Sequence, residues 1–488
     1  MSPTVIILLI LGYFLALIFI ARLTSRKGDN ADFFLGSRKS PWYVVAFGML
    51  GASLSGVTFI SVPGWVGTTQ FAYLQMVLGY VPGYLIVAFV LLPLYYRMRL
   101  TSIYTYLESR FGRRAYLTGA WFFLFSRIIG ASFRLFLVAI VLQMAVFEKL
   151  SFHMPFALTV LITIALIWLY TFRGGIRTII WTDTLQTAFM LAAVLVSVYA
   201  IANILDFNFE ELTSAVRESP LSRTFFFDDP RDSRFFFKQF IAGMFITIAM
   251  TGLDQDMMQK NLSCRNLRDA QKNMLSFSAV LVLVNLIFLS LGVLLYIFAA
   301  QSGMDIPGAS DELYPALATS GALGSAVGVL FILGLIAAAY SSADSALTSL
   351  TTSFSIDILR IDRLPSAIAK RKRMQVHVGM SLTLVAVILI FRAINNSAVI
   401  DGLFTAAGYT YGPLLGLFAF GLSAKKKVRD RYIPLVALLS PLLAYLLVWL
   451  APRILDGYQV GYEVLILNGM ITYIGMALAP SEPETSKS

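Results

Sequence analysis

The sequence contains little charge and few of the residue types that build metal or redox sites. Charged residues make up 13% of the 488 residues, whereas about a quarter is usual in a soluble domain. The single cysteine, Cys264, excludes an internal disulfide and a cysteine metal centre. The two histidines, His153 and His377, stand alone near expected loop ends, where we expect them at a membrane interface. Because zinc-protease, phosphate-loop and nucleophile-elbow motifs are also missing, we do not expect an enzyme.

Apolar residues, in contrast, make up 58% of the chain and occur in long runs. Runs of about 18 or more such residues can cross a hydrocarbon core of about 30 Å. We therefore expect an all-α polytopic membrane protein with about thirteen transmembrane helices, near residues 4–22, 43–70, 72–96, 116–146, 152–172, 179–203, 235–259, 273–300, 321–356, 374–394, 398–421, 431–450 and 461–480. The first run is followed by basic residues and no cleavage site, which indicates a retained helix rather than a signal peptide.

Lysine and arginine are concentrated in alternate loops, whereas the acidic segments 204–234 and 301–320 lie in the other loops. The first set of loops holds most of the 38 basic residues, including Arg22, Arg38, Arg97, Arg113, Arg173, Arg177, Lys260, Lys272, Arg360, Arg373, Lys425 and Lys487. The positive-inside rule then places the N-terminus outside and the C-terminus in the cytoplasm. The net charge of +11 is thus a topology signal, and we expect no nucleic-acid partner. The polar tail 481–488 is expected to be disordered.

The expected helix 43–70 contains residues that interrupt a regular helix. Its small, kinking and hydroxyl residues are Gly51, Ser53, Ser55, Gly56, Thr58, Pro63 and Gly64. At about 1.5 Å per residue, Ser55 lies roughly 18 Å from the cytoplasmic end, near the middle of the membrane. An interruption at this depth frees backbone groups to bind a solute or an ion. The alternative is a small-residue face on which another helix packs.

A second interruption is expected near the end of helix 235–259, where Gly252, Asp254 and Asp256 follow one another closely. It lies five helices after the first interruption. This spacing predicts two inverted five-helix repeats, about 43–203 and 235–421, with a binding site between them.

The expected helix 321–356 carries an unusual group of oxygen atoms, supplied by Ser341, Ser342, Asp344, Ser345 and Thr348. An aspartate in the middle of a membrane helix costs about 2.5–3.5 kcal/mol, so it usually faces a partner, water or an ion. Hydroxyl, carbonyl and carboxylate oxygens are the ligands that hard cations prefer. Asp183 falls at a similar depth and could meet Asp344. Alternatively, Asp183 is a first-turn acid that interacts with the helix dipole.

Two arginines, Arg127 and Arg134, lie seven residues apart in the expected helix 116–146 and therefore share one face. Permanent charges inside a span are unlikely to face lipid. They could bind an anionic group of a solute or pair with acids such as Asp344. A purely structural ion pair or a side chain that reaches the interface are the alternatives.

Several segments together resemble the sodium:solute symporter family. They are Asp32–Arg38 (DFFLGSR), Tyr106–Gly112 (YLESRFG), Gly174–Gln186 (GGIRTIIWTDTLQ), Asp254–Lys260 (DQDMMQK) and Leu335–Ile358, the stretch that carries Ser341 and Asp344. The resemblance implies the leucine-transporter fold, with a ten-helix transport core at 43–421. An extra helix and a cytoplasmic loop (1–42) would precede this core, and two helices (422–480) would follow it.

The resemblance also implies positions for sodium. The main site would use backbone carbonyls at Gly51 and Leu54, with Ala338, Ser341 and Ser342 on the helix 321–356. Some members, including bacterial sialic acid symporters, have a second site, whose positions fall on Asp183, Ser341, Asp344 and Ser345. Those members carry serine where this chain has Asp344, a departure that either strengthens cation binding or supplies a partner for an arginine.

For the solute, the resemblance implies a site on the first interrupted helix and its neighbours. The expected substrate-binding residues are Ser53, Ser55, Thr58, Gln75, Arg127, Arg134 and Met250. The arginine that binds the carboxylate in the sialic acid members aligns with Gly130, one turn from both Arg127 and Arg134. The gating aromatic of the sugar symporters aligns near Met250. The solute is therefore not fixed by the resemblance.

We expect a sodium-coupled secondary active symporter in the plasma (inner) membrane of a bacterium. It would import a small organic solute, such as a sugar, a sugar acid like sialic acid or another carboxylate, by alternating access. Its expected partners are the solute, Na⁺ and the lipid bilayer, and we expect a monomer. A proton-coupled symporter of the same fold, a channel and a sensor that does not transport its solute are the alternatives.

Overall fold

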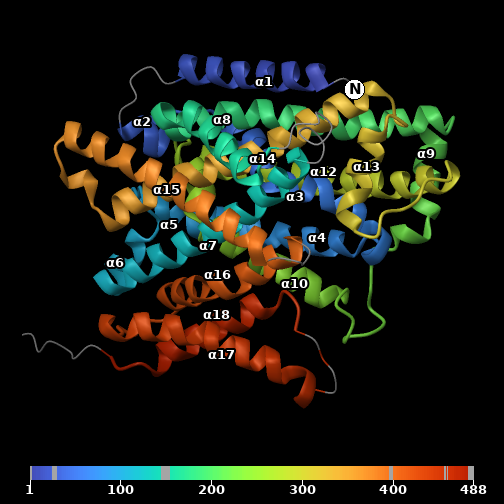
Figure 1. Ribbon diagram of the computed structural model, residues 1–488. Helices are drawn as coiled ribbons and strands as arrows, with labels where there is room; N and C mark the ends of the chain where they lie inside the picture. The colour runs from blue at the N-terminus through green and yellow to red at the C-terminus, as the bar shows by residue number, and fades with distance from the viewer. Residues whose placement is uncertain are drawn as a thin grey trace, which may run out of the picture.

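The computed structural model describes residues 3–24, 30–143, 154–394, 399–455, 458 and 460–481, and this part of the chain is helical without a β-sheet (Figure 1). Its longer helices are α1 (Pro3–Thr24), α3 (Trp42–Thr69), α4 (Ala72–Ile86), α7 (Arg113–Leu142), α8 (Phe156–Ile204), α10 (Phe236–Thr247), α12 (Leu267–Gln301), α14 (Ser325–Ser353), α15 (Ser366–Ile394), α16 (Val399–Ser423), α17 (Ile433–Ile454) and α18 (Val464–Leu478). Shorter helices are α2 (Asn30–Leu35), α5 (Leu92–Arg97), α6 (Thr105–Arg110), α9 (Phe209–Glu218), α11 (Gln255–Leu262) and α13 (Leu313–Ser320).

Many of these helices have the length and hydropathy of membrane spans. Within the described ranges, seven helices are long and apolar enough to cross a membrane, and two bent helix pairs raise the number to nine. The bent pairs are 42–69, with an angle of 56°, and 236–262, with an angle of 65°. The membrane class predicted from composition is therefore confirmed, and so are both predicted interruptions.

Each expected helical range overlaps a helix of the described residues, with bounds that differ by up to eight residues, as at α15, which begins at Ser366 instead of 374. One expected loop is replaced by helix. We expected a loop between 172 and 179, but α8 continues through this region and breaks sharply at Gly175, where φ is +50°. A Cβ atom at Gly175 would lie 2.5 Å from the carbonyl oxygen of Phe33, so α2 packs directly against the break. The expected disordered tail falls, apart from Ser481, outside the described residues, as does His153.

Helix α14 is the centre of the bundle. The apolar window of α14 with the short segment that follows it is 83% buried, compared with 22% for the window that contains α17. Helices α3 and α8 pack against α14, α1 covers α8 on one side, and α17 and α18 lie with α16 on the opposite side (Figure 1). The polar residues of α14 are therefore far from lipid, which explains why a membrane protein tolerates them.

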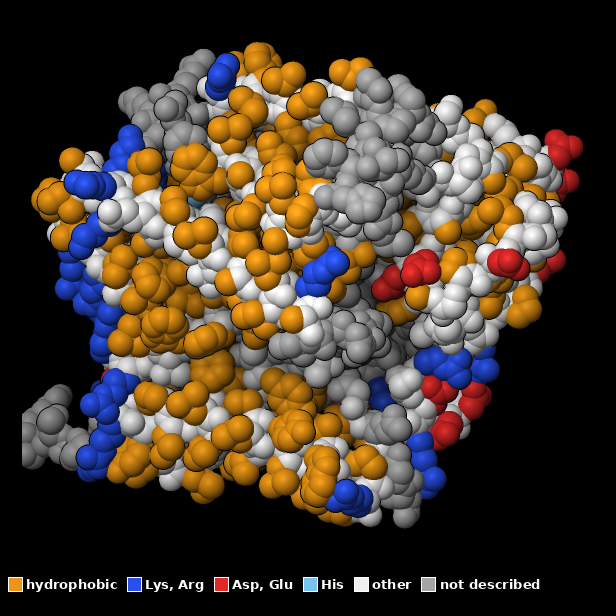
Figure 2. Space-filling view, viewed as in Figure 1, with side chains coloured by type: hydrophobic (Ala, Val, Ile, Leu, Met, Phe, Trp, Pro, Cys, Tyr) orange, Lys and Arg blue, Asp and Glu red, His pale blue; other side chains and the backbone are white. Residues whose placement is uncertain are grey.

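Basic and acidic side chains gather at opposite ends of the molecule, although some basic side chains also lie beside the acidic ones (Figure 2). In Figure 2, Lys and Arg side chains gather along the left edge, where Figure 1 shows α6 and the first turns of α15. Acidic side chains gather at the opposite edge, near α9. This distribution matches the alternation of basic and acidic loops in the sequence.

Three polar residues that we expected in loops or at an interface are instead buried. Lys260 is 1% exposed on α11, and Arg373 is 1% exposed and lies 4.1 Å from the centre of the Phe33 ring. His377 is 2% exposed and contacts the hydroxyl groups of Thr171 and Thr351. Lys260 and Arg373 lie within about two turns of a helix end, where charge counting cannot distinguish a buried side chain from a solvated one, and His377 lies about one turn further into α15.

We predict that Gly175→Ala destabilises the protein. The left-handed backbone costs a non-glycine residue roughly 1–3 kcal/mol, and the new Cβ would also overlap the Phe33 carbonyl. The thermal unfolding temperature of the purified protein in detergent should fall. Gly379→Ala on α15 is the control, because a Cβ there meets no atom within 4 Å. An unchanged unfolding temperature for Gly175→Ala would show that α2 can move away from the break.

Candidate functional site: a cavity and a buried polar cluster at two broken helices

Helix α3 breaks at Ser55, which is buried and has a φ of 45° that non-glycine residues seldom adopt. The break leaves the carbonyl groups of the preceding turn, residues 51–54, without a regular helical environment. Among the described residues, no side chain donates a hydrogen bond to these four carbonyl oxygens. This turn is therefore a set of buried acceptors that the protein itself does not satisfy with side chains.

The break between α10 and α11 is satisfied differently, by buried side chains. The Tyr95 hydroxyl donates to the Gly252 carbonyl at 2.9 Å, and the Tyr104 hydroxyl donates to the Leu253 carbonyl at 3.0 Å. Asp254 caps α11, since its Oδ1 accepts from the amides of Asp256 at 2.8 Å and Met257 at 3.2 Å. This second break is thus held by buried side chains, whereas no side chain of the described residues donates to the carbonyl groups before the break in α3.

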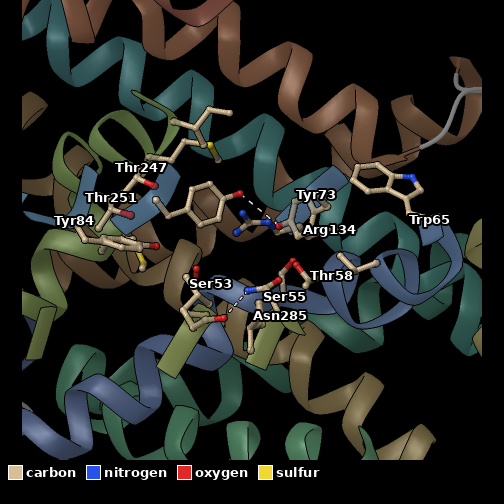
Figure 3. A pocket seen from close by; sticks show the side chains of 18 of the residues that line it. Ser53, Ser55, Thr58, Trp65, Tyr73, Tyr84, Arg134, Thr247, Thr251 and Asn285 are labelled. Carbon is tan, nitrogen blue, oxygen red and sulfur yellow. Dashed lines mark hydrogen bonds between the residues drawn. The ribbon is translucent and has the colours of Figure 1, made fainter. Parts of the chain in front are cut away.

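A cavity of about 100 Å³ lies between these two breaks (Figure 3). Its lining residues come from α3, α4, α7, α10, η5 (Ile248–Gly252), α11 and α12: they are Ala52, Ser53, Leu54, Ser55, Thr58, Val62, Trp65, Tyr73, Tyr80, Tyr84, Arg127, Arg134, Ile246, Thr247, Met250, Thr251, Met257, Leu281 and Asn285. If one water fills about 10–15 Å³, the cavity holds roughly seven to ten water-sized groups.

The cavity presents one guanidinium group that forms no ion pair among the described residues, together with hydroxyl and aromatic side chains. Figure 3 shows Ser53, Ser55, Thr58 and Asn285 below the Arg134 guanidinium, and Thr247 and Thr251 across the cavity. Arg134 is 9% exposed, its Nε has no hydrogen-bond partner, and no carboxylate of the described residues forms an ion pair with it. A desolvated cation of this kind is a binding group for an anion.

Arg127 lines the same cavity but is already paired. Its guanidinium donates to the Asp256 carboxylate and lies 3.9 Å from Asp254 Oδ2, which also accepts from the Tyr411 hydroxyl. The pairing of Arg127 with Asp344 that the sequence suggested is therefore wrong, because Arg127 pairs with the two acids at the start of α11. Seven residues of spacing put both arginines on one face, but only the tertiary structure separates their roles.

Of the expected substrate-binding residues, Gln75 alone does not line the cavity. It is fully buried, its amide nitrogen donates to the Arg234 carbonyl at 2.8 Å, and its oxygen accepts from the Phe226 amide at 3.1 Å. Gln75 therefore holds the 205–235 connection onto α4. Sequence reasoning missed Tyr73, Tyr80 and Tyr84 on α4, and Asn285 on α12, which do line the cavity.

A larger hollow of about 570 Å³ adjoins the cavity, and Trp65 and Tyr73 line both. It lies at the end of the molecule that carries the 205–235 connection, and Arg234 is one of its lining residues. The side chain of Arg234 donates hydrogen bonds to Asp232, which lowers the pKa of the Asp232 carboxyl group. A hollow of about 520 Å³ at the basic end, beside α2 and the start of α15, shares no lining residue with the cavity.

The residues expected to form the main sodium site meet where α3 contacts α14. A Cβ built on Gly51 would lie 2.4 Å from Thr187 Oγ1 of α8 and 3.3 Å from Ser341 Oγ of α14, so glycine allows α3 to approach both helices closely. Ser342 Oγ is buried without a hydrogen-bond partner, and Leu54 and Ala338 are each 1% exposed. An orphaned hydroxyl beside backbone carbonyls that no side chain satisfies has the chemistry of a site for a hard monovalent cation.

Asp183 lies beside this site but is not a free carboxylate. Lys260 Nζ contacts Asp183 Oδ2 at 2.7 Å, and Ser341 Oγ donates to Asp183 Oδ1 at 2.6 Å. Both charged side chains are at most 1% exposed. Sequence analysis assigned Lys260 to a loop. Its position only six residues after Asp254, at the break of the second bent span, was the signal that it lies inside the bundle.

Asp344 is a buried carboxylate for which no ion pair is found among the described residues. Its Oδ2 accepts a hydrogen bond from the Tyr170 hydroxyl at 2.7 Å, whereas its Oδ1 has no partner. Ser345 Oγ and Thr348 Oγ1 are also buried without partners. We expected Asp183 and Asp344 to come together. Both carboxylates do lie between α8 and α14, but they contact different residues.

Two broken spans, a central cavity and a buried cluster of cation ligands define a class of protein: helical membrane transporters that bind their ligands at interrupted helices. The family model for the sodium:solute symporter family matches residues 33–430. The chain belongs to the sodium:solute symporter family, and sodium is the coupled ion.

Relatives of known function agree with this assignment. The human sodium/iodide cotransporter is 26% identical over 408 residues, which are 82% of this chain; the chain spans 62% of the cotransporter's length. The sodium/sialic acid symporter of Aliivibrio fischeri is 26% identical over 434 residues, covering 82% of this chain and 79% of that protein. The solved structure of a Na⁺-coupled sialic acid symporter, in a substrate-bound outward-open state, has the same fold, with a TM-score of 0.80, 19% identity and 98% coverage of both chains.

We predict that Lys260→Met lowers stability, because it leaves Asp183 as a buried charge without a counter-ion. Breaking a buried pair in this way costs about 3–5 kcal/mol. The double variant Asp183→Asn with Lys260→Met should recover most of the loss, and thermal unfolding in detergent would measure both. Lys272→Met, at an exposed position, is the control. A Lys260→Met protein as stable as the wild type would show that Asp183 does not need the ammonium group.

Proposed function

We propose that this protein is a sodium-driven symporter of a small organic anion. The observation that carries the proposal is Arg134, a buried guanidinium in the central cavity without a carboxylate partner. A solute carboxylate would satisfy it with charge-assisted hydrogen bonds, while the hydroxyl groups of α3 and α10 would bind the rest of the solute. Two relatives named for iodide and sialic acid also act on anions, which supports this solute class.

The size of the cavity suits a compact solute. A volume of about 100 Å³ holds roughly seven to ten water-sized groups. Short-chain carboxylates and small hydroxy acids fall in this range, and the adjoining hollow of about 570 Å³ would hold the rest of a larger sugar acid. Tyr73, Tyr80 and Tyr84 offer hydroxyl groups and ring faces for the apolar part of such a solute.

In this proposal, Na⁺ occupies the main site formed by Gly51, Leu54, Ala338, Ser341 and Ser342. Ser341 donates its proton to Asp183, so its lone pairs remain available to the ion. Na⁺ in this position would connect the broken α3 to α14 and so complete the solute cavity. Because linkage is reciprocal, Na⁺ must raise the affinity for the solute by the factor by which the solute raises the affinity for Na⁺.

We further propose thirteen transmembrane helices with the N-terminus outside and the C-terminus in the cytoplasm of a bacterial inner membrane. The separation of basic and acidic side chains to opposite ends supports this orientation (Figure 2). The bent spans at corresponding positions support inverted repeats at about 43–203 and 235–421 within a core at 43–421, as in the leucine-transporter fold. Segments 1–42 and 422–480 would lie outside that core, and the transporter would work as a monomer.

Alternating access then explains the arrangement of the hollows. The cavity adjoins the hollow on the proposed outer side and shares no lining residue with the one on the basic, cytoplasmic side. The structure therefore corresponds to a state in which the solute enters from outside. Closure of Trp65 and Tyr73 over the solute, followed by rearrangement of α2 and the inner half of α8, would open the inner side.

We predict that Arg134→Gln lowers the uptake of small carboxylates by roughly 10–100-fold in kcat/KM, the equivalent of one charge-assisted hydrogen-bond pair. The assay is uptake into proteoliposomes driven by a Na⁺ gradient, with monocarboxylates, sialic acid and glucose as solutes. Arg217→Gln, at an exposed position on α9, is the control.

Four outcomes of this assay would contradict the proposal. Glucose accumulation unaffected by Arg134→Gln would exclude an anionic solute. Accumulation that persists when choline replaces Na⁺ at constant pH would indicate proton coupling. Binding without accumulation would identify a sensor, and flux that never exceeds equilibrium would identify a channel.

We also predict that Ser342→Ala weakens the apparent affinity for Na⁺ by about tenfold or more, because it removes one oxygen ligand of the ion. The change should appear in the Na⁺ dependence of uptake and in the stabilisation of the purified protein by NaCl relative to KCl. Ser290→Ala is the control, since Ser290 Oγ only contacts the Leu286 carbonyl of its own helix. An unaltered Na⁺ dependence would exclude Ser342 from the main site.

A further inference from the structure

Asn285 of α12 lines the central cavity and carries a polar atom that has no partner among the described residues. Its side chain is buried, and its amide nitrogen donates to the Leu281 carbonyl at 2.8 Å. Because a carbonyl oxygen only accepts hydrogen bonds, this contact fixes which end of the amide is the nitrogen. The other end, Oδ1, is buried and has no hydrogen-bond partner. Asn285 therefore offers an acceptor to the contents of the cavity.

Unpartnered groups of two opposite kinds thus line the cavity. Figure 3 shows the Arg134 guanidinium on one side and Asn285, with Ser55 and Thr58, on the other. The guanidinium of Arg134 can only donate hydrogen bonds, whereas Oδ1 of Asn285 can only accept them. A solute that satisfies both must carry an anionic group at one end and a hydrogen-bond donor at the other.

The charge of the lining distinguishes a hydroxyl donor from an ammonium donor. No aspartate or glutamate of the described residues lines the cavity, because Asp254 and Asp256 pair with Arg127 at the start of α11 instead. A buried ammonium group without a carboxylate is costly to desolvate, and Arg134 would repel it. A hydroxyl group needs only the neutral acceptor that Asn285 supplies. The lining thus favours a hydroxyl group over an amine.

We propose that the solute of this transporter is a hydroxycarboxylate, and that Asn285 selects it by accepting a hydrogen bond from the hydroxyl group of the solute. Small hydroxy acids and sugar acids belong to this class, whereas plain alkyl carboxylates and their amino derivatives lie outside it. The inference rests on the proposed function, because Arg134 binds the carboxylate of the same solute.

The unpartnered oxygen explains how one residue can select the class. A solute without the hydroxyl group would fill the cavity and leave Oδ1 of Asn285 without a hydrogen bond. A site built to bind a hydroxyl group discriminates against an analogue that lacks it, because the buried partner then stays unpaired. Ser55 and Thr58 are less selective, since their hydroxyl groups donate as well as accept and can rotate. The amide of Asn285 is held by its bond to the Leu281 carbonyl and presents only an acceptor.

The test compares solutes that differ by a single group. The full-length protein in proteoliposomes, with an inward Na⁺ gradient, is offered butyrate, its hydroxy derivatives at each carbon and the corresponding amino derivatives. We expect the best hydroxybutyrate to exceed both butyrate and the amino derivatives by about 10–100-fold in kcat/KM. Arg134→Gln should lower the uptake of butyrate and the hydroxybutyrates alike, because they share the carboxylate.

Asn285→Leu keeps the approximate size of the side chain and removes the acceptor, so it should reduce the preference for the hydroxybutyrate to within about threefold. Asn273→Leu is the matched control. Asn273 lies on the same helix, is buried and has an Oδ1 without a partner, but it does not line the cavity. The preference is a ratio of two solutes on one preparation, so a partial loss of folded protein in either variant does not change it.

The outcomes separate the inference from the proposed function. Equal uptake of butyrate and the hydroxybutyrates by the wild type, with both lowered by Arg134→Gln, would overturn the inference and leave the proposed function intact. A preference for an amino derivative would also overturn the inference. An undiminished preference in Asn285→Leu would exclude Asn285 from the recognition of the hydroxyl group. Uptake of none of these carboxylates would contradict the proposed function itself, and the inference with it.

Discussion

A carboxylate in the interior of a membrane protein must be neutralised, and this constraint determines the centre of the molecule. Asp183 is neutralised by Lys260, which reaches it from α11 in the second half of the chain. Because neither group can remain alone at such depth, the ion pair joins two helices that are distant in sequence. Helix α14 passes beside the pair, and Ser341 donates to the second oxygen of Asp183. The positions of α8, α11 and α14 are thus linked through one carboxylate.

The two broken spans obey the same constraint in different ways. At the α10–α11 break, Tyr95, Tyr104 and Asp254 supply the partners that the interrupted backbone needs. At Ser55 of α3, no side chain of the described residues supplies donors to the carbonyl groups of the preceding turn. One break is therefore completed by side chains of the protein, whereas the other offers carbonyl groups that have no side-chain partner among the described residues.

Binding energy in such a site comes from buried polar groups that have no partner within the protein itself. Arg134 has no acid, Ser342 has no hydrogen-bond partner, and Asp344 has one unpaired oxygen, all within the buried core. Each of these groups is costly when the site is empty and favourable when a solute or an ion is bound. Coupling follows, because an ion that orders α3 against α14 shares contacts with the cavity that binds the solute.

The sequence by itself determined the membrane class, the positions of the helices and both interruptions. These features depend on local properties, namely runs of apolar residues, glycine and proline in a span, and the alternation of basic loops. It also pointed to the oxygen atoms of α14 as candidate ion ligands, because a carboxylate among hydroxyls in a membrane helix has few other roles. Gly51, which the sequence marks as an interruption of its helix, allows close contacts with α8 and α14 in the structure.

Only the tertiary structure decided which charged side chains form ion pairs. Arg127 and Arg134 are equivalent in the sequence, yet one contacts Asp256 and the other faces the cavity. From the sequence, Lys260 is expected in a loop, but the bend of 65° places it inside the bundle. Gln75 is expected in the cavity, but its amide group binds the 205–235 connection instead. Ion pairing depends on distances of a few ångströms between helices that are far apart in the chain, and no local pattern encodes those distances.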